Sequence, residues 1–171
     1  MRRAPTTLPM PTRFEKLLSR LTGFGVEFVL VGGVAASIHG SSRATFDLDV
    51  VYARNDENLT RITDALAQLH PYLRGAPSGL PFHFDFKTLK NGLNFTLTTQ
   101  LGDIDLFGEI AGGGTYQDLL PHSIGLCLDD KTSIRVVDLD TLIRLKNAAG
   151  RARDLEAVAE LLRIRTESGE R

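Results

Sequence analysis

The chain has 171 residues, of which 42% are hydrophobic and 24% are charged, a balance typical of a soluble globular protein. Twenty Lys and Arg residues against 21 Asp and Glu residues give a net charge of −1, which excludes a strongly basic nucleic-acid coat but not a local basic patch. The single cysteine cannot form an internal disulfide, and no apolar run approaches the roughly 18 residues that span a bilayer. We therefore expect a cytoplasmic protein with no membrane partner.

The elements of the first half follow from hydrophobic periodicity and from the Gly, Pro and polar residues that bound each apolar stretch. In chain order we expect a flexible tail over 1–11, a helix over 12–22, a strand over 27–32, a helix over 33–40, a strand over 45–52 and a helix over 55–73. Strand 27–32 is a continuous apolar run, which is typical of a strand buried on both faces. Strand 45–52 alternates, so Phe46, Leu48 and Val50 are expected in the core, opposite Asp47 and Asp49.

The second half is predicted from the same patterns. We expect strands over 82–89, 93–100, 102–110, 124–128 and 133–137, followed by helices over 139–150 and 153–165. Asn91-Gly92 predicts a hairpin turn between the first two of these strands, because this pair favours the positive φ angles that such turns need. The residues expected to face inward from the last helix are Leu155, Val158, Leu161 and Leu162. Together the elements predict one α+β domain over 12–171, a mixed β-sheet flanked by helices.

Two of the predicted strands carry aspartates at alternate positions. Alternation places Asp47 and Asp49 on one face, about 6–7 Å apart along the backbone, and Asp103 and Asp105 share a face in the same way. If the two strands pair, three carboxylates converge on shared cations, and either Asp103 or Asp105 supplies the third. Such a group of oxygen ligands favours Mg²⁺ and suits two-metal phosphoryl transfer.

Gly32 and Gly33 lie at the junction of the buried strand and the helix that follows it. Because they have no side chains, backbone N–H groups can approach a phosphate there, and the helix dipole adds a modest attraction. Arg43 precedes the acidic strand, where we expect it either to contact phosphate or to form a salt bridge with Asp47 or Asp49. The sequence thus predicts a phosphate site beside a metal site.

These residues, in this order, resemble the polymerase-β-type nucleotidyltransferase superfamily. The closer resemblance is to the minimal AbiEii-like nucleotidyltransferases, several of which are toxins of toxin–antitoxin pairs. It rests on a glycine pair, a short helix, an Asp-x-Asp unit and a later acidic strand, and it extends over roughly residues 26–161. The residues that match the first motif are Gly32, Gly33, Ala35, His39, Gly40, Arg43, Thr45, Asp47 and Asp49.

The resemblance implies a polymerase-β-like fold and catalytic roles for three carboxylates. Asp47 and Asp49 match the metal-binding pair, and Asp105 matches the third carboxylate, the candidate base toward the acceptor hydroxyl. Two Mg²⁺ ions, or Mn²⁺ in their place, are the implied cofactors.

The resemblance also implies a set of residues that bind the nucleotide. Gly32 and Gly33 match the turn that holds the phosphates, and Lys146 and Arg151 match basic residues of the C-terminal helices. Many active relatives have serine as the second residue of the pair, where its hydroxyl contacts phosphate. This chain departs from them, because it has Gly33.

The function implied by the resemblance is transfer of a nucleoside monophosphate from an NTP to an acceptor hydroxyl of RNA or tRNA, of a protein or of a small molecule. The resemblance extends to the toxin of a toxin–antitoxin pair, with an antitoxin as partner. One alternative is a catalytically silent module of the same fold that binds nucleotide or a partner. The other is an unrelated α+β scaffold whose acidic strands are coincidental.

Overall fold

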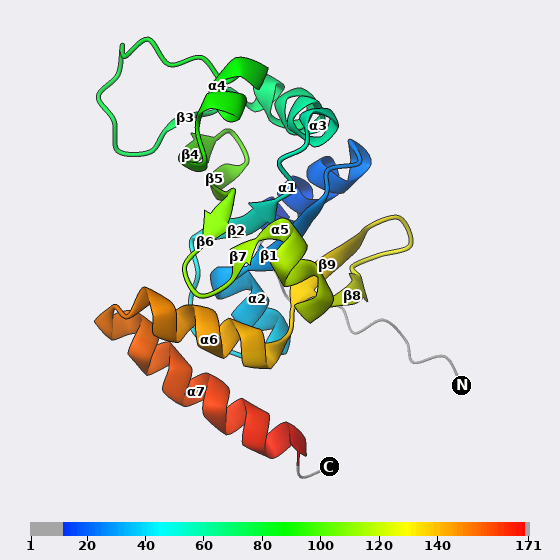
Figure 1. Ribbon diagram of the computed structural model, residues 1–171, viewed down its shortest axis with the longest axis vertical. Helices are drawn as coiled ribbons and strands as arrows, with labels where there is room; N and C mark the ends of the chain where they lie inside the picture. Colours follow the sequence, from blue (N-terminus) through cyan, green and yellow to red (C-terminus); the bar gives the residue numbers. More distant parts are fainter. Residues whose placement is uncertain (1–11, 170–171) are drawn as a thin grey trace.

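A seven-stranded mixed sheet forms the centre of the protein, and helices lie against it (Figure 1). The computed structural model describes residues 12–169, so the predicted tail over 1–11 lies outside the described residues. The strands are β1 Phe28–Val31, β2 Asp47–Tyr52, β3 Tyr72–Leu73, β4 Asn94–Thr99, β5 Gly102–Phe107, β6 Glu109–Ile110, β7 Gly114–Thr115, β8 Ser123–Cys127 and β9 Ser133–Val137. The helices are α1 Thr12–Gly23, α2 Gly32–His39, α3 Asp56–Leu66, α4 Phe86–Asn91, α5 Tyr116–Leu119, α6 Leu139–Ala149 and α7 Ala152–Gly169, with 3₁₀ turns at Ala67–Leu69 and Leu120–His122.

The strand order explains why the sheet is mixed. The order is β3-β4-β5-β2-β1-β9-β8, with β6 and β7 paired separately as a two-stranded hairpin. Strand β2 runs parallel to β5, and β1 runs parallel to β9, whereas the remaining neighbours are antiparallel. The predicted α+β class, a mixed sheet flanked by helices, is confirmed.

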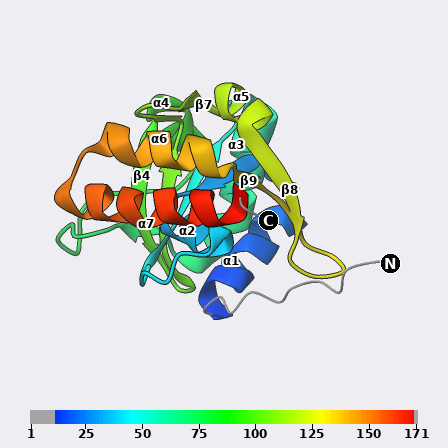
Figure 2. The same cartoon turned by 90° about the horizontal axis from the view of Figure 1, so that it is seen from below.

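The core forms around β1, which lies between β2 and β9. All four of its residues are buried, as the continuous apolar run predicted. Helices α1 and α3 contact each other, while α6 contacts both α2 and α7 (Figures 1 and 2). None of the helices in residues 12–169 combines the length and apolar character needed to cross a membrane.

The predicted hairpin at Asn91-Gly92 is wrong. The segment before it forms helix α4, because the Asp85 side chain accepts a hydrogen bond from the Thr88 N–H and so caps a helix. Gly92 has φ −99° and donates its N–H to the Thr88 carbonyl, as the end of a helix and not as a tight hairpin turn. Strand β4 pairs instead with β3 and β5.

Three hydrophobic residues that were expected in the core are exposed. Phe46 is 84% exposed because β2 begins one residue later, at Asp47, so the alternation does not extend back to it. On α7, Val158 and Leu161 are buried as predicted, but Leu155 and Leu162 are exposed. The buried stripe of this helix is narrower than its apolar pattern, because α7 lies at the edge of the molecule and packs against α6 (Figure 1).

We predict that Asn58→Ala destabilises the fold. Asn58 is fully buried; its amide donates to the carbonyls of Glu27 and Ala53 and its Oδ1 accepts from the Glu27 N–H, which ties α3 to the ends of β1 and β2. Alanine leaves these backbone groups without partners, at a cost of about 2–4 kcal/mol. Urea unfolding measures the loss. Thr60→Ala, on the exposed side of the same helix, is the control and should change stability little; equal effects of the two variants would contradict the assignment.

Candidate metal centre and nucleotide cleft

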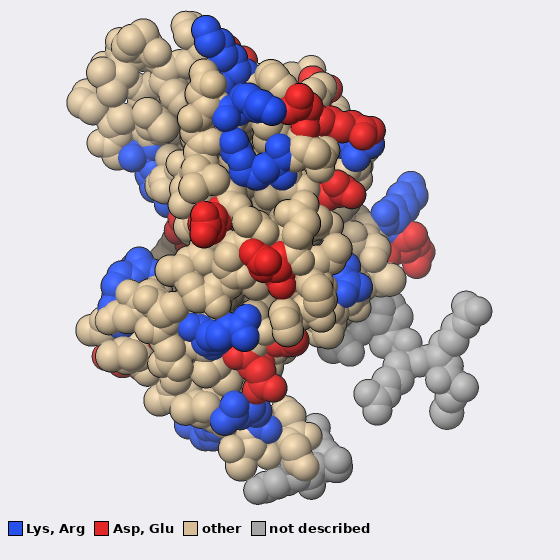
Figure 3. Space-filling model, viewed as in Figure 1, with Lys and Arg blue, Asp and Glu red and all other residues tan. Residues whose placement is uncertain are grey.

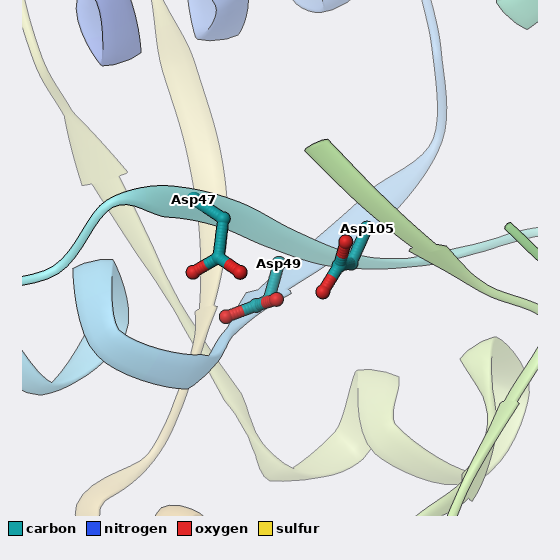
Figure 4. Close-up of side chains that lie close together, drawn as sticks. All are labelled: Asp47, Asp49 and Asp105. Atoms are coloured by element: carbon teal, nitrogen blue, oxygen red, sulfur yellow. The ribbon is translucent and has the colours of Figure 1, made fainter. Parts of the chain in front are cut away.

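Three carboxylates converge where β2 and β5 run side by side. The parallel register sets Asp47 opposite Asp103 and Asp49 opposite Asp105. Carboxylate oxygens of Asp47, Asp49 and Asp105 all lie within 4.8 Å of one another, and the side chains gather on one side of the sheet (Figure 4). Asp103 is not part of this group. The structure therefore brings Asp105 to the Asp47–Asp49 pair.

The opposite face of the same strands holds the carboxylates in place. Leu48 and Ile104 alternate with the aspartates and are fully buried, and Val50 and Leu106 are each only 1% exposed. Because the side-chain period of a strand is two, shifting either strand by one residue would bury carboxylates and expose leucine or isoleucine. The hydrophobic core thus fixes the register that makes the acidic group.

Crowding and burial disfavour full ionisation of this group. Burial raises the pKa of Asp49 to about 8, and the charges of Asp47 and Asp105 add to the rise while Lys146 opposes it. Burial also raises the pKa of Asp105, against the opposing charge of Arg74. A divalent cation would relieve this repulsion, and hard carboxylate oxygens are the ligands that Mg²⁺ and Mn²⁺ take.

The predicted glycine pair lies directly beside the carboxylates. Gly32 begins α2 with φ +71°, and a Cβ on it would lie 2.0 Å from Asp49 Oδ2, so the site has no room for a side chain there. The N-cap residue Val31 provides no side-chain cap for the first turn of α2. The backbone N–H groups of this turn, and the positive end of the helix dipole, are therefore suited to an anion.

The departure from serine at Gly33 has a structural counterpart. A Cβ on Gly33 would lie 2.4 Å from Thr45 Oγ1, so Thr45 fills the space that a serine side chain would need. The Thr45 hydroxyl donates a hydrogen bond to the backbone carbonyl of Asp47, at 3.4 Å. A hydroxyl is thus present beside the glycine pair, but it belongs to the segment that leads into the acidic strand.

Lys146 and Arg151, predicted as nucleotide-binding residues, share one buried carboxylate. Lys146 Nζ lies 3.5 Å from Asp154 Oδ1, and Arg151 Nε lies 2.7 Å from Asp154 Oδ2, while the Asp154 side chain is only 2% exposed. Burial would raise the pKa of Asp154, but hydrogen bonding and the charge of Arg151, with Lys146, hold it below its usual value. The ionised Asp154 therefore positions both cations at the cleft.

Of the two roles predicted for Arg43, the salt bridge with Asp47 or Asp49 is wrong, and the contact with phosphate stays a prediction. Arg43 forms its ion pair with Glu156 of α7, at 3.3 Å, and not with Asp47 or Asp49. Its side chain is 42% exposed and lines the cleft, so this surface ion pair leaves it accessible to a ligand.

Arg74, which no sequence pattern singled out, lies among the acidic side chains. Its guanidinium contacts Asp105 Oδ1 at 2.8 Å, Asp103 Oδ2 at 3.2 Å and Asp47 Oδ2 at 3.4 Å. Arg74 directly follows the two-residue strand β3, which is not a predicted strand, so no pattern placed it beside β5. Only the pairing of β3 with β4, and of β4 with β5, carries it there.

A cleft of about 700 Å³ opens above the acidic group. Its wall includes the glycine pair, the exposed ring of Phe46, Glu109 of the β6–β7 hairpin, and the basic residues Arg43, Lys146, Arg151 and Arg153. Over the visible face of the molecule, basic and acidic side chains are interspersed, and neither sign of charge covers it (Figure 3). The cleft therefore combines an acidic floor with a basic wall, an arrangement suited to a metal-bound polyphosphate.

No protein-family model and no curated protein matches this sequence. Among solved structures, the chain is similar to a candidate nucleotidyltransferase from Thermotoga maritima, with a TM-score of 0.48 and 16% identity over 92% of this chain and 91% of that one. A likeness this distant assigns neither a family nor an activity to this chain.

We predict that the metal-free protein loses stability relative to its Asp49→Asn variant as the pH rises. The pKa of Asp49 rises from its ordinary value of 3.8 to about 8 in the fold. A raised folded-state pKa stabilises the fold below the unfolded pKa, and this contribution is lost as the pH rises toward the folded value. With EDTA present, the variant should therefore gain about 2 kcal/mol or more over the wild type between pH 4 and pH 8. Urea unfolding across this range measures the difference; a constant difference would show an ordinary pKa.

We predict that Gly32→Ala destabilises the protein and displaces Asp49. The residue combines a positive φ with the 2.0 Å approach to Asp49 Oδ2, so alanine brings both backbone strain and a collision. The expected cost is about 1–3 kcal/mol. Gly23→Ala is the matched control, because a Cβ on Gly23, at the end of α1, would meet no atom within 4 Å, and it should be neutral or slightly stabilising. Thermal unfolding of the two variants tests this.

Proposed function

We propose that the protein is a metal-dependent nucleotidyltransferase that transfers a nucleoside monophosphate from an NTP to an acceptor hydroxyl. The observation that carries the proposal is the convergence of Asp47, Asp49 and Asp105 within 4.8 Å, on the floor of a cleft that also holds Gly32 and Gly33. The proposed metal ligands lie beside a helix N-terminus suited to phosphate, and this arrangement supports transfer from a triphosphate.

The residues present fit a divalent metal. All three donors are carboxylates. Burial raises the pKa of Asp49 and of Asp105, and the charge of Asp47 adds to both, so a bound cation would favour the ionised forms. When bound, two Mg²⁺ or Mn²⁺ ions would neutralise the triphosphate and lower the pKa of the acceptor hydroxyl. Asp47 and Asp49 would hold these ions from β2, and Asp105 would hold one of them from β5.

The chemistry assigned to the protein is one proton transfer and the positioning of two substrates. The acceptor oxygen attacks the α-phosphorus of the NTP, and the bond from that phosphorus to the oxygen bridging to the β-phosphate breaks. Pyrophosphate leaves, and the nucleoside monophosphate remains on the acceptor as a phosphodiester. Asp105 accepts the hydroxyl proton of the acceptor, which is general-base catalysis.

The basic wall of the cleft would bind the triphosphate. The first-turn N–H groups of α2 would donate to phosphate oxygens, and Lys146, held by Asp154, would neutralise charge on the leaving pyrophosphate. Arg43 and Arg151 retain exposed guanidinium groups at the cleft and would add further contacts.

One observation favours the alternative of a catalytically silent nucleotide-binding module. Arg74 already forms ion pairs with Asp47 and Asp105, so a guanidinium is placed against two of the three carboxylates. If that arrangement persisted with nucleotide bound, the protein would bind an NTP without turning it over.

We predict transfer of label from α-³²P-labelled NTPs to an acceptor in total RNA or in cell lysate, with release of pyrophosphate and with Mg²⁺ or Mn²⁺ required. Asp47→Asn and Asp105→Asn should each lower the rate by about 10²-fold or more, because each removes a metal ligand and the second also removes the base. Asp64→Asn, an exposed aspartate on α3, removes the same charge away from the cleft and should keep the activity.

The same preparations distinguish the two functions. A transferase gives pyrophosphate with at least one of the four NTPs, whereas a silent module gains thermal stability from metal and NTP but releases none. If metal and NTP give neither thermal stabilisation nor pyrophosphate release under any of these conditions, both functions are contradicted. Separation of labelled RNA from labelled protein identifies the acceptor class.

The family resemblance alone supports extending the proposal to the toxin of a toxin–antitoxin pair. In that case, induced expression should arrest growth, Asp47→Asn should abolish the arrest, and co-expression of a partner antitoxin should relieve it.

A further inference from the structure

We propose that Arg74 is a built-in counter-cation that competes with divalent metal for the carboxylates, and that Asp103 retains its guanidinium when metal binds. The inference rests on the proposed function, because it concerns how the same site accepts its metal. It assigns a role to two residues that the catalytic scheme leaves unused.

The guanidinium of Arg74 lies against two of the three converging carboxylates. Its terminal nitrogens lie 2.8 Å from Asp105 Oδ1 and 3.4 Å from Asp47 Oδ2, so one cation contacts two of the three proposed metal ligands. The guanidinium and a divalent metal would therefore compete for the carboxylates of Asp47 and Asp105, and their positive charges repel each other.

Asp103 contacts Arg74 from outside the group of three carboxylates. Its register opposite Asp47 places it on the same face as the acidic group, yet it lies outside the three residues that converge. It contacts Arg74 Nε at 3.2 Å, although that N–H is not aligned for a hydrogen bond. Asp103 is therefore a fourth carboxylate that can hold the guanidinium without taking part in the metal site.

Hydrogen bonds attach Arg74 to strand β4. Its backbone N–H donates to the Thr96 carbonyl at 3.0 Å, and Nη2 donates to the Leu97 carbonyl at 2.8 Å, so the residue is attached to β4. The chain then leaves the sheet in the long connection to α4 (Figure 1). We expect the side chain, with its backbone attached to β4, to rotate and exchange Asp47 and Asp105 for closer contact with Asp103 when metal binds.

The consequence is that metal binds weakly until nucleotide is present. In the absence of metal, Arg74 compensates the charge that crowding makes costly. An NTP brings further negative charge, which strengthens metal binding and draws the guanidinium away from the metal ligands. Arg74 would thus couple metal loading to nucleotide binding, as a positioning residue that does not touch the reacting atoms.

The test is the affinity for Mn²⁺, measured from the electron paramagnetic resonance signal of the free ion, without nucleotide. Arg74→Gln should bind Mn²⁺ about tenfold tighter or more than the wild type, because a competing charge next to the ligands is removed. Arg61→Gln is the control, since it removes the same charge from an arginine on α3 that pairs with Glu57. Its affinity should equal that of the wild type.

A second measurement serves if Arg74→Gln does not fold. Arg74→Lys keeps the charge but replaces the planar fork with a single ammonium that cannot reach three carboxylates at once, so Mn²⁺ affinity should rise severalfold. Asp103→Asn should lower Mn²⁺ affinity in the wild-type background and have a smaller effect beside Arg74→Lys, because its action runs through the arginine.

The outcomes separate this inference from the proposed function. Equal or weaker Mn²⁺ binding by the Arg74 variants, with the wild type binding Mn²⁺, overturns the inference and leaves the metal site intact. Failure of every protein to bind Mn²⁺, even with an NTP, overturns the proposed function and the inference together. Tighter Mn²⁺ binding by the Arg74 variants, with unchanged Mn²⁺ binding by Arg61→Gln, supports competition between Arg74 and the metal.

Discussion

The parallel pairing of β2 with β5 is the interaction on which the site depends. It sets Asp49 opposite Asp105, with Asp47 two residues earlier on the same face of β2, so that three acids from two strands share a small volume. The pairing is imposed by the other face, where Leu48 and Ile104 are fully buried. Burial of apolar side chains therefore provides the free energy that holds like charges together, at a distance that they would not keep on their own.

Charge compensation around this group is divided between two sides of the cleft. Arg74 neutralises the acids from the end of β3, while Lys146 and Arg151 belong to a separate unit with the buried Asp154. The second unit is positioned by α6 and α7, which contact each other and approach the sheet through α2. An acidic floor and a basic wall are thus built from different elements, and a metal with a polyphosphate would satisfy both at once.

The local elements follow largely from the sequence, and the errors have specific causes. Strand β1, helix α2 and the two acidic strands were predictable because continuous apolar runs, terminal glycines and strict alternation are local signals. The hairpin at Asn91-Gly92 was wrong because the capping hydrogen bond of Asp85 favours a helix over a strand. The predicted burial of Phe46 was wrong because alternation does not show where a strand starts.

The sequence by itself determined which carboxylates share a face and which glycines begin α2, because a strand's period of two and the needs of a helix terminus are properties of neighbouring residues. Only the tertiary structure decided that Asp105, and not Asp103, converges with Asp47 and Asp49. It also gave Arg43 the partner Glu156 and placed Arg74 among the acids. These contacts join residues that are tens of positions apart, and they depend on strand order and register. Such quantities are fixed by packing of the whole core and leave no signal in a short stretch of chain.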